Sequence, residues 1–246
     1  MHKGEVTALD GQTERLIPCA LFDFDDTLCK GDSILPYLIF AVRKGYAPWT
    51  QLPKAGLAFL SQRLDPGKTV RAKETALSFI RGRTQREMDD LARAFFREEQ
   101  YRKVFADALA ELERHRCAGR RVIVISASAD VYMRVLPEFL PVDAVLSTRC
   151  RVDAQGRYTG EIEGNCKGDE KPQRLNAYLR MEHAALDAAA SFAYGDSPGD
   201  APMLRLTAHP VAVNAGRRLK ALVPSAAQAA WQRTMGGEAR ARGTKD

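Results

Sequence analysis

The chain has 246 residues, enough to bury one large core, and its 45% hydrophobic and 28% charged residues are typical of soluble globular proteins. A net charge of +6 and a pI near 9.1 favour anionic partners, such as phosphorylated metabolites or lipid headgroups. The five cysteines are scattered, and no aromatic residues interleave with the basic ones. We therefore expect no disulfide framework, no zinc site and no nucleic-acid partner.

The ends of the chain carry no targeting signal that we recognise. The first eighteen residues mix acids and bases and lack the apolar centre of a secretion signal. The longest apolar run, residues 34–42, is far shorter than the roughly 20 residues of a membrane helix. These features predict a cytoplasmic protein without a transmembrane span and with flexible tails at 1–14 and 236–246, and they leave its oligomeric state open.

A buried strand of a parallel sheet is predicted over residues 19–22, and it stops at Asp23-Phe24-Asp25-Asp26-Thr27. Ligands of open α/β sheets bind beyond the carboxyl ends of the strands, so Asp23 and Asp25 are expected at a functional edge. Carboxylates this close repel one another, which favours a hard cation among them.

These acids have other interpretations. Acidic residues often only solvate the loop after a strand. An EF-hand loop is excluded, because its glycine position holds Leu28 and its last ligand position holds Ile34. What remains is a carboxylate able to form a covalent phosphate intermediate, beside a second carboxylate able to handle a proton.

Residues 33–119 carry almost no strand signal and predict a series of helices, which is too long for a simple crossover. Charged amphipathic helices are expected over 85–100 and 101–116. Their inward candidates are Leu91, Phe95, Phe96, Val104, Phe105, Leu109 and Leu112. We interpret residues 31–107 as a helical cap inserted into a core formed by residues 15–30 and 108–230.

Later strands are predicted over residues 121–126, 144–147, 190–194 and 211–213, the last of these closing the sheet. Residues 149–163 alternate around a turn and predict a β-hairpin beside the main sheet.

Polar side chains again follow these strands. Ser126 ends one strand, and Asp196 and Asp200 follow another. Pro172 is suited to the first position of a helix that runs to Met181, which puts Lys171 at its cap.

The order of these pieces resembles the haloacid dehalogenase (HAD) superfamily, and in particular its phosphoserine phosphatase-like subgroup. The similar segments are residues 165–171, 195–197 and 209–214, within a resemblance that covers residues 17–222. The resemblance implies an α/β fold with a Rossmann-like, doubly wound, mostly parallel sheet and an inserted all-helical cap.

The resemblance also implies a Mg²⁺-dependent phosphomonoester hydrolase that acts on a small polar phosphorylated metabolite, such as a phosphoserine-like compound. Asp23 would form an aspartyl-phosphate, and Asp25 would serve as acid and then as base. Mg²⁺ would be held by Asp23, the main-chain carbonyl of Asp25, and Asp196. Asp200 would orient these groups.

Three further assignments follow from the resemblance. Ser126, preferred over Ser128, would bind a phosphoryl oxygen, and Thr27 would contact substrate or fix the loop. The catalytic lysine is either Lys171, as in the bacterial phosphoserine-phosphatase-like hydrolases, or Lys167, in the preceding loop, as the phosphoserine phosphatases suggest.

Other functions stay open. Some relatives within the superfamily act on phosphatidylglycerophosphate, and the segment from Ile34 to Phe40 with Trp49, Leu57, Phe59 and Leu60 fits either a membrane surface or a buried cap core. Prolines in this segment favour the buried core. A dehalogenase or a non-catalytic phosphate binder has no need of Asp25. Arg71, Lys73, Arg81 and Arg83 are candidates for a second anionic group of the substrate.

Overall fold

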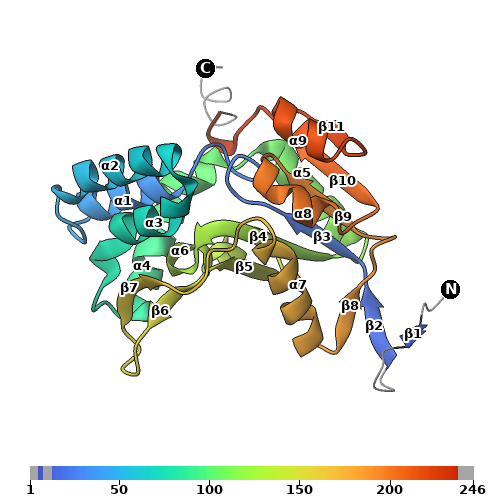
Figure 1. Ribbon diagram of the computed structural model, residues 1–246, viewed down its shortest axis with the longest axis horizontal. Helices are drawn as coiled ribbons and strands as arrows, with labels where there is room; N and C mark the ends of the chain where they lie inside the picture. The colour runs from blue at the N-terminus through green and yellow to red at the C-terminus, as the bar shows by residue number, and fades with distance from the viewer. Residues whose placement is uncertain (1–4, 8–12, 238–246) are drawn as a thin grey trace, which may run out of the picture.

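The computed structural model describes residues 5–7 and 13–237, and within this part of the chain six parallel strands form the central sheet (Figure 1). Their order is β11-β10-β9-β3-β4-β5, so β3, which leads into Asp23, lies in the middle between β4 and β9. The α/β fold class is therefore confirmed. The strands are β3 (Cys19–Phe22), β4 (Arg121–Ala129), β5 (Ala144–Thr148), β9 (Phe192–Gly195), β10 (His209–Val213) and β11 (Ala227–Ala229).

Side chains alternate between the two faces of the sheet and enter two hydrophobic cores. Leu21 and Ile123 belong to the core that also contains residues of α7, α8 and α9. Phe22 and Val124 belong to the core that contains residues of α5, and this second core continues into the helical insertion. The sheet and the insertion thus share one buried cluster. The covering helices are α5 (Ala106–Cys117), α7 (Glu170–Met181), α8 (Ala201–Leu204) and α9 (Arg217–Leu222), and the short α6 (Asp130–Met133) follows β4.

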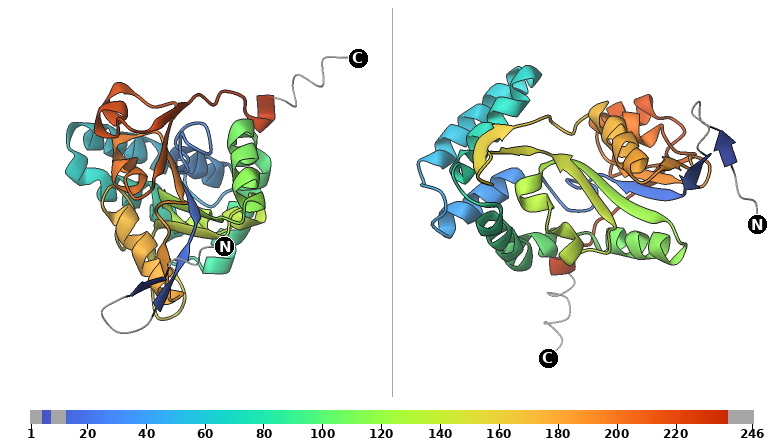
Figure 2. Two further views of the ribbon diagram at one scale, coloured as in Figure 1. Left: turned by 90° about the vertical axis from the view of Figure 1, so that its right-hand side faces the viewer. Right: turned by 90° about the horizontal axis from the view of Figure 1, so that it is seen from below.

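The insertion between β3 and β4 gathers at one end of the molecule, beyond the sheet (Figures 1 and 2). Its α-helices are α1 (Ile34–Arg43), α2 (Gln51–Leu64), α3 (Thr69–Leu77) and α4 (Gln85–Phe95). Thr84 and Glu87 start α4 with a reciprocal capping box. Of the inward candidates, all are buried except Leu109, which is partly buried.

The end of the insertion differs from the two long helices that we predicted. After α4 the chain makes a π-helical turn over Phe96–Gln100 and a short 3₁₀ turn over Tyr101–Lys103. Val104 and Phe105 are then extended, and the Phe105 amide donates to the Leu28 carbonyl at 3.0 Å. Apolar residues at these positions suit a helix face equally well, so periodicity did not reveal the break.

The hairpin of residues 149–163 forms its own two-stranded sheet, β6 (Cys150–Val152) and β7 (Tyr158–Ile162). It packs against the insertion, where the Gly82 amide donates to the Tyr158 carbonyl at 2.8 Å. The Tyr158 amide donates in return to the Arg83 carbonyl at 2.9 Å. The expected hairpin is therefore present outside the six-stranded sheet, and it bonds both to the insertion and, through the Cys150 amide, to Asp130 of α6.

The N-terminal region contains more structure than the expected tail of residues 1–14. β1 (Glu5–Thr7) pairs antiparallel with β2 (Thr13–Ile17), which pairs in parallel with β8 (Ala184–Leu186). The remaining parts of the two expected tails, 1–4, 8–12 and 238–246, lie outside the described residues.

The described part of the C-terminal segment is attached to the core. It adds the strand β11 beyond β10, which we had predicted to be the last strand. Trp231 stacks on Tyr194, with ring centroids 5.9 Å apart. The Ala106 amide donates to the Arg233 carbonyl at 2.8 Å, and the Met235 amide donates to the Val104 carbonyl at 2.9 Å. The segment therefore binds the point where the insertion rejoins the core. Among residues 5–7 and 13–237, no helix is both long and apolar enough to cross a bilayer.

Candidate active site

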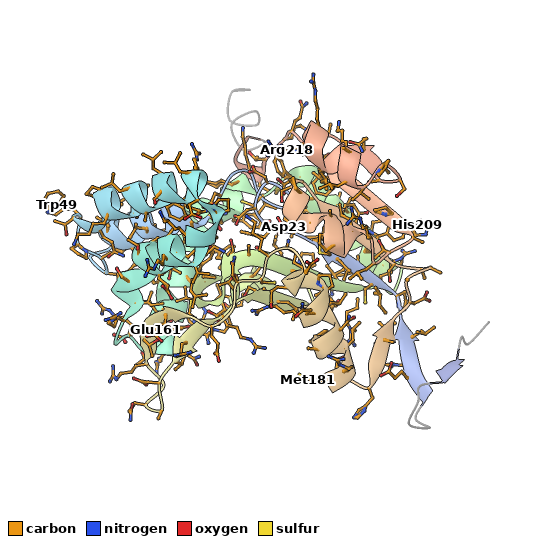
Figure 3. All side chains as sticks on the ribbon, in the orientation of Figure 1. Asp23, Trp49, Glu161, Met181, His209 and Arg218 are labelled. Carbon is orange, nitrogen blue, oxygen red and sulfur yellow. The ribbon has the colours of Figure 1, made fainter. Side chains whose placement is uncertain are left out.

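A pocket of about 220 Å³ lies where β3, β4 and β9 end, bounded by the start of α7 and by the insertion. Figure 3 shows Asp23 near the middle of the molecule, where these parts meet. Of the catalytic, metal-binding and phosphate-binding candidates, all but Thr27 line this pocket. The lining includes Asp23, Asp25, Ser126, Lys167, Lys171, Asp196 and Asp200.

Asp23 is held at the end of a fully buried strand. Its amide donates to the Tyr194 carbonyl of β9 at 3.0 Å. The Lys171 ammonium donates to Oδ1 of Asp23 at 2.6 Å and to Oδ1 of Asp200 at 2.5 Å. Burial opposes the charged form of Lys171, but these two carboxylates outweigh it and raise its pKa. Burial raises the pKa of Asp23 to about 6, against the attraction of Lys171.

The two candidate lysines differ in their surroundings. α7 begins at Glu170, so Lys171 lies in its first turn and not at the cap that Pro172 suggested. Lys171 is only 2% exposed and bridges two carboxylates. Lys167 also lines the pocket, yet its side chain has no ion pair with any residue that the structure describes. The geometry favours Lys171 for the central position.

The loop after β9 supplies two more carboxylates. Thr27 is fully buried and donates to Oδ1 of Asp196 at 3.2 Å, which favours a positioning role over a substrate contact. Oδ2 of Asp200 accepts from the amide and the hydroxyl of Ser197, at 3.0 and 2.8 Å. One carboxylate oxygen each from Asp23, Asp196 and Asp200 lies within 4.8 Å of the others.

Gly195 makes this arrangement possible, and we did not single it out from the sequence. A Cβ atom at this position would lie 2.5 Å from Cβ of Asp200 and 2.9 Å from its Cγ. Asp200 therefore occupies the space that any other side chain at position 195 needs. The available signal was a glycine directly between a buried strand and an acidic loop.

Asp25 has a different environment from Asp23. Ser128 donates its hydroxyl to Oδ2 of Asp25, while Oδ1 is buried without a hydrogen-bond partner among the described residues. Burial raises the pKa of Asp25 to about 7, and the negative charge of Asp32 adds to the effect. The Ser128 amide donates to the Ser126 hydroxyl at 3.0 Å. Both serines line the pocket, and Ser128 also holds Asp25.

The insertion provides the opposite wall, for which sequence reasoning gave only partial guidance. Its side chains are Asp32, Ile34, Phe59, Gln62, Thr69 and Lys73. Lys73 of α3 is buried, and its ammonium donates to the Ala127 carbonyl at 2.5 Å and to Oδ1 of Asn165 at 2.6 Å. Burial lowers the pKa of Lys73 to about 8. Of the four basic candidates from this region, Lys73 alone lines the pocket.

The carboxylate cluster fits a hard divalent cation. Its donors are all oxygens, and among the described residues a single buried lysine, Lys171, contacts the cluster by ion pairs. Burial, together with the charges of Asp23 and Asp200, raises the pKa of Asp196 to about 8. A bound cation relieves this repulsion. The cluster contains the expected side chains of Asp23 and Asp196 and adds the carboxylate of Asp200.

The chain is similar to several known proteins. Residues 20–205 match the family model of haloacid dehalogenase-like hydrolases. Protein CicA of Caulobacter vibrioides is 30% identical over 187 residues, which cover 75% of this chain and 81% of that protein. A histidinol-phosphatase of Neisseria meningitidis is 25% identical over 204 residues, covering 82% of this chain and 92% of that one.

The fold is also similar to that of a solved phosphoserine phosphatase, in a structure of its phospho-aspartyl intermediate analogue. The TM-score is 0.60, with 19% identity and coverage of 92% of this chain and 99% of that one.

Proposed function

The chain belongs to the haloacid dehalogenase-like hydrolases, and we propose that it is a Mg²⁺-dependent phosphatase of a small polar phosphate monoester, such as a phosphoserine-like compound. The observation that carries this proposal is the pairing of Asp23 with Asp25 at one strand end. One carboxylate lies against an ammonium, and the other lies in a buried site that favours its protonated form.

Asp23 is the proposed nucleophile. Its pKa of about 6 leaves it mainly ionised at neutral pH, and Lys171 fixes one of its oxygens. A carboxylate oxygen of Asp23 forms a bond to phosphorus while the bond from phosphorus to the leaving oxygen breaks, which gives an aspartyl-phosphate.

Asp25 is the proposed acid and base. Burial raises its pKa to about 7, so near neutral pH both the protonated form that the leaving oxygen requires and the ionised form are populated, and Ser128 holds its orientation. In the second step the ionised Asp25 accepts a proton from water. The water oxygen then bonds to phosphorus, the bond to Asp23 breaks, and inorganic phosphate is released.

Ser126 and Lys171 are the proposed contacts of the phosphoryl oxygens. Ser126 lines the pocket, and Lys171 places a positive charge beside the oxygen of Asp23 that does not attack. Both stabilise negative charge on the phosphoryl group as the transition state forms. Lys167 lines the same pocket and adds positive charge at its edge.

The side chains of Asp23, Asp196 and Asp200, with the main-chain carbonyl of Asp25, would hold the Mg²⁺ ion. When bound, the ion offsets the repulsion between the carboxylates and an anionic phosphate. Thr27 orients Asp196, and Ser197 orients Asp200.

The size of the pocket supports a small substrate. Its volume of about 220 Å³ is below the usual range of drug-sized pockets. Phe59 gives the cap wall an apolar surface, and Oε1 of Gln62 is buried without a partner among the described residues. This oxygen is suited to accept a hydrogen bond from a hydroxyl or ammonium group of the leaving alcohol.

Phosphate release from a panel of phosphorylated amino acids, sugar phosphates and alcohol phosphates tests the proposal. We expect turnover that requires Mg²⁺, that EDTA abolishes, and that is fastest for small polar esters. The Asp23→Asn protein, purified in parallel, controls for contaminating phosphatases. A folded protein that hydrolyses none of these esters with Mg²⁺ present contradicts the proposal.

A further inference from the structure

Helix α2 exposes three of its leucines, although Leu52 and Phe59 of the same helix pack against the core. Its buried residues are Gln51 and Ala55, while Leu57, Leu60 and Leu64 are 70%, 57% and 84% exposed. The three leucines are spaced by three and four residues, which places them on one side of the helix. An exposed apolar stripe of this kind marks a surface that contacts something other than water.

Trp49, just before α2, extends this surface. It is 72% exposed, and Figure 3 shows it at the outer end of the insertion, far from Asp23. We call the surface formed by Trp49, Leu57, Leu60 and Leu64 the outer cap face. The sequence had offered a buried cap core as the preferred alternative to a membrane surface. The structure divides the predicted segment: Ile34 and Phe40 are buried, whereas Ile39, Trp49, Leu57 and Leu60 are exposed.

Basic residues outnumber acidic ones around the outer cap face. Asp65, which directly follows Leu64 at the end of α2, pairs with Lys68. Residues 33–64 contain Arg43, Lys44, Lys54 and Arg63 but no aspartate or glutamate. Arg43 and Lys44 pair with Glu99 and Glu98. Lys54 and Arg63, both on α2, are exposed and make no ion pair within the described part of the chain.

We propose that the outer cap face docks the protein onto an anionic lipid bilayer. The leucines and Trp49 would enter the boundary between headgroups and acyl chains, where tryptophan is favoured. Lys54 and Arg63 would then pair with lipid phosphates. A second copy of the chain fits this face less well. In a two-fold dimer through the face, Lys54 and Arg63 of one copy would lie near the same two cations of the other copy and repel them.

This docking relates directly to the pocket. Phe59 and Gln62 of the same helix line the pocket, while Leu57 and Leu60 belong to the outer cap face. A single helix thus connects the bilayer to the cap wall. The inference does not depend on the proposed function, since it concerns binding alone.

Vesicle flotation of the full chain tests this proposal, with phosphatidylcholine vesicles that either contain or lack phosphatidylglycerol. We expect flotation only with the anionic vesicles, and a loss of flotation at high salt. Replacing Leu57, Leu60 and Leu64 together by serine, or making Lys54→Glu with Arg63→Glu, lowers the bound fraction on the order of tenfold or more.

Matched controls are available elsewhere on the surface. Met181 is 84% exposed at the end of α7, and Met181→Ser removes an apolar side chain without touching the cap. Arg217→Glu with Arg218→Glu reverses two exposed charges on α9, where Figure 3 labels Arg218. Both controls float like the wild type, and thermal unfolding verifies that every variant is folded.

Two results overturn the proposal. One is a vesicle result: the wild type stays unbound with anionic vesicles at low salt, or the triple leucine variant floats as well as the wild type. The other is a concentration-dependent dimer in sedimentation analysis that the leucine replacements dissociate, because the outer cap face then binds a second copy.

Discussion

The pocket has a core wall, formed by the ends of β3, β4 and β9 and the start of α7, and a cap wall, formed by α2, α3 and the loop before α1. On the core wall, the polar groups are hydrogen-bonded to one another: Lys171 bonds to Asp23 and to Asp200, and Thr27 donates to Asp196. On the cap wall, Phe59 and Gln62 line the pocket without such a network.

This difference suits the core wall to catalysis and the cap wall to substrate specificity. Groups that hold one another are oriented before substrate arrives, which is what transition-state stabilisation requires. Under the proposed function, the cap wall would contact the leaving group of the substrate and select among leaving groups. Variants of the core wall should therefore change kcat, and variants of the cap wall should change KM and stability.

The largest effect is expected for Asp23→Asn. The amide is a poor nucleophile, so kcat for an aryl phosphate should fall by about 10³-fold or more. Circular dichroism should stay unchanged, because asparagine keeps the size of the side chain and an oxygen for Lys171. Asp90→Asn, an exposed acid on α4, serves as the control with unchanged kcat. Retained turnover in Asp23→Asn removes this residue as nucleophile.

Lys171→Met and Lys167→Met make the same substitution at two places in one pocket. Lys171→Met leaves Asp23 and Asp200 buried without their cation, which should cost about 3–5 kcal/mol in urea unfolding and about 10²-fold in kcat. Lys167→Met should change stability little, because its side chain has no ion pair among the described residues. A larger loss of kcat in Lys167→Met reverses the assignment.

Gly195→Ala tests how tightly the core wall is packed. The new Cβ overlaps Asp200, whose shift also displaces Lys171, so we expect about tenfold lower kcat and a loss of about 1–3 kcal/mol. Gly199→Ala is the matched control, since its Cβ would lie 3.4 Å from the flexible end of Lys167. Equal behaviour of the two variants contradicts this packing argument.

Lys73→Met should give the smallest effect, and one that depends on pH. The pKa of Lys73 is about 8 in the folded protein against an ordinary value of 10.5, because burial disfavours its charge. Between these pH values the unfolded chain binds more protons, so the stability contributed by Lys73 rises as pH increases. Below about pH 8 that contribution is absent, and it is complete above about pH 10.5.

Urea unfolding at about pH 7 and about pH 10 measures this difference. The wild type should gain about 1–3 kcal/mol relative to Lys73→Met at the higher pH. Taking the difference between the two proteins cancels groups that titrate equally in both. A difference that stays the same at the two pH values contradicts the burial of the Lys73 charge.

The core wall could be predicted from the sequence because its residues follow directly from strand ends. The carboxyl ends of neighbouring parallel strands lie at one edge, so Asp23, Ser126 and Asp196 had to converge once their strands were recognised. The start of α7 was misplaced by two residues, yet Lys171 still entered the pocket, since one turn of helix spans that error.

The cap wall could not be predicted in the same way, because its contacts depend on how helices pack at a distance. Lys73 had one usable signal, its place beside Ala72 and Ala76 on the buried side of α3. Nothing local indicates that it would reach Ala127 and Asn165. The short strands β8 and β11 were missed because three residues carry too little pattern, and tertiary pairing alone makes them strands.

The contact between the C-terminal segment and residues 104–106 has a consequence for motion. Two backbone hydrogen bonds pin the chain where the insertion returns to the core, and the shared hydrophobic cluster continues through the same place. Because it is held at this point, the insertion cannot rotate away from the core as a rigid body about residues 104–106. The insertion is fastened on its other side as well, where Ser33 bonds to Ser128 and Tyr132, and Lys73 donates to Ala127 and Asn165. Any opening of the pocket that moved the insertion as one body would have to break contacts on both sides.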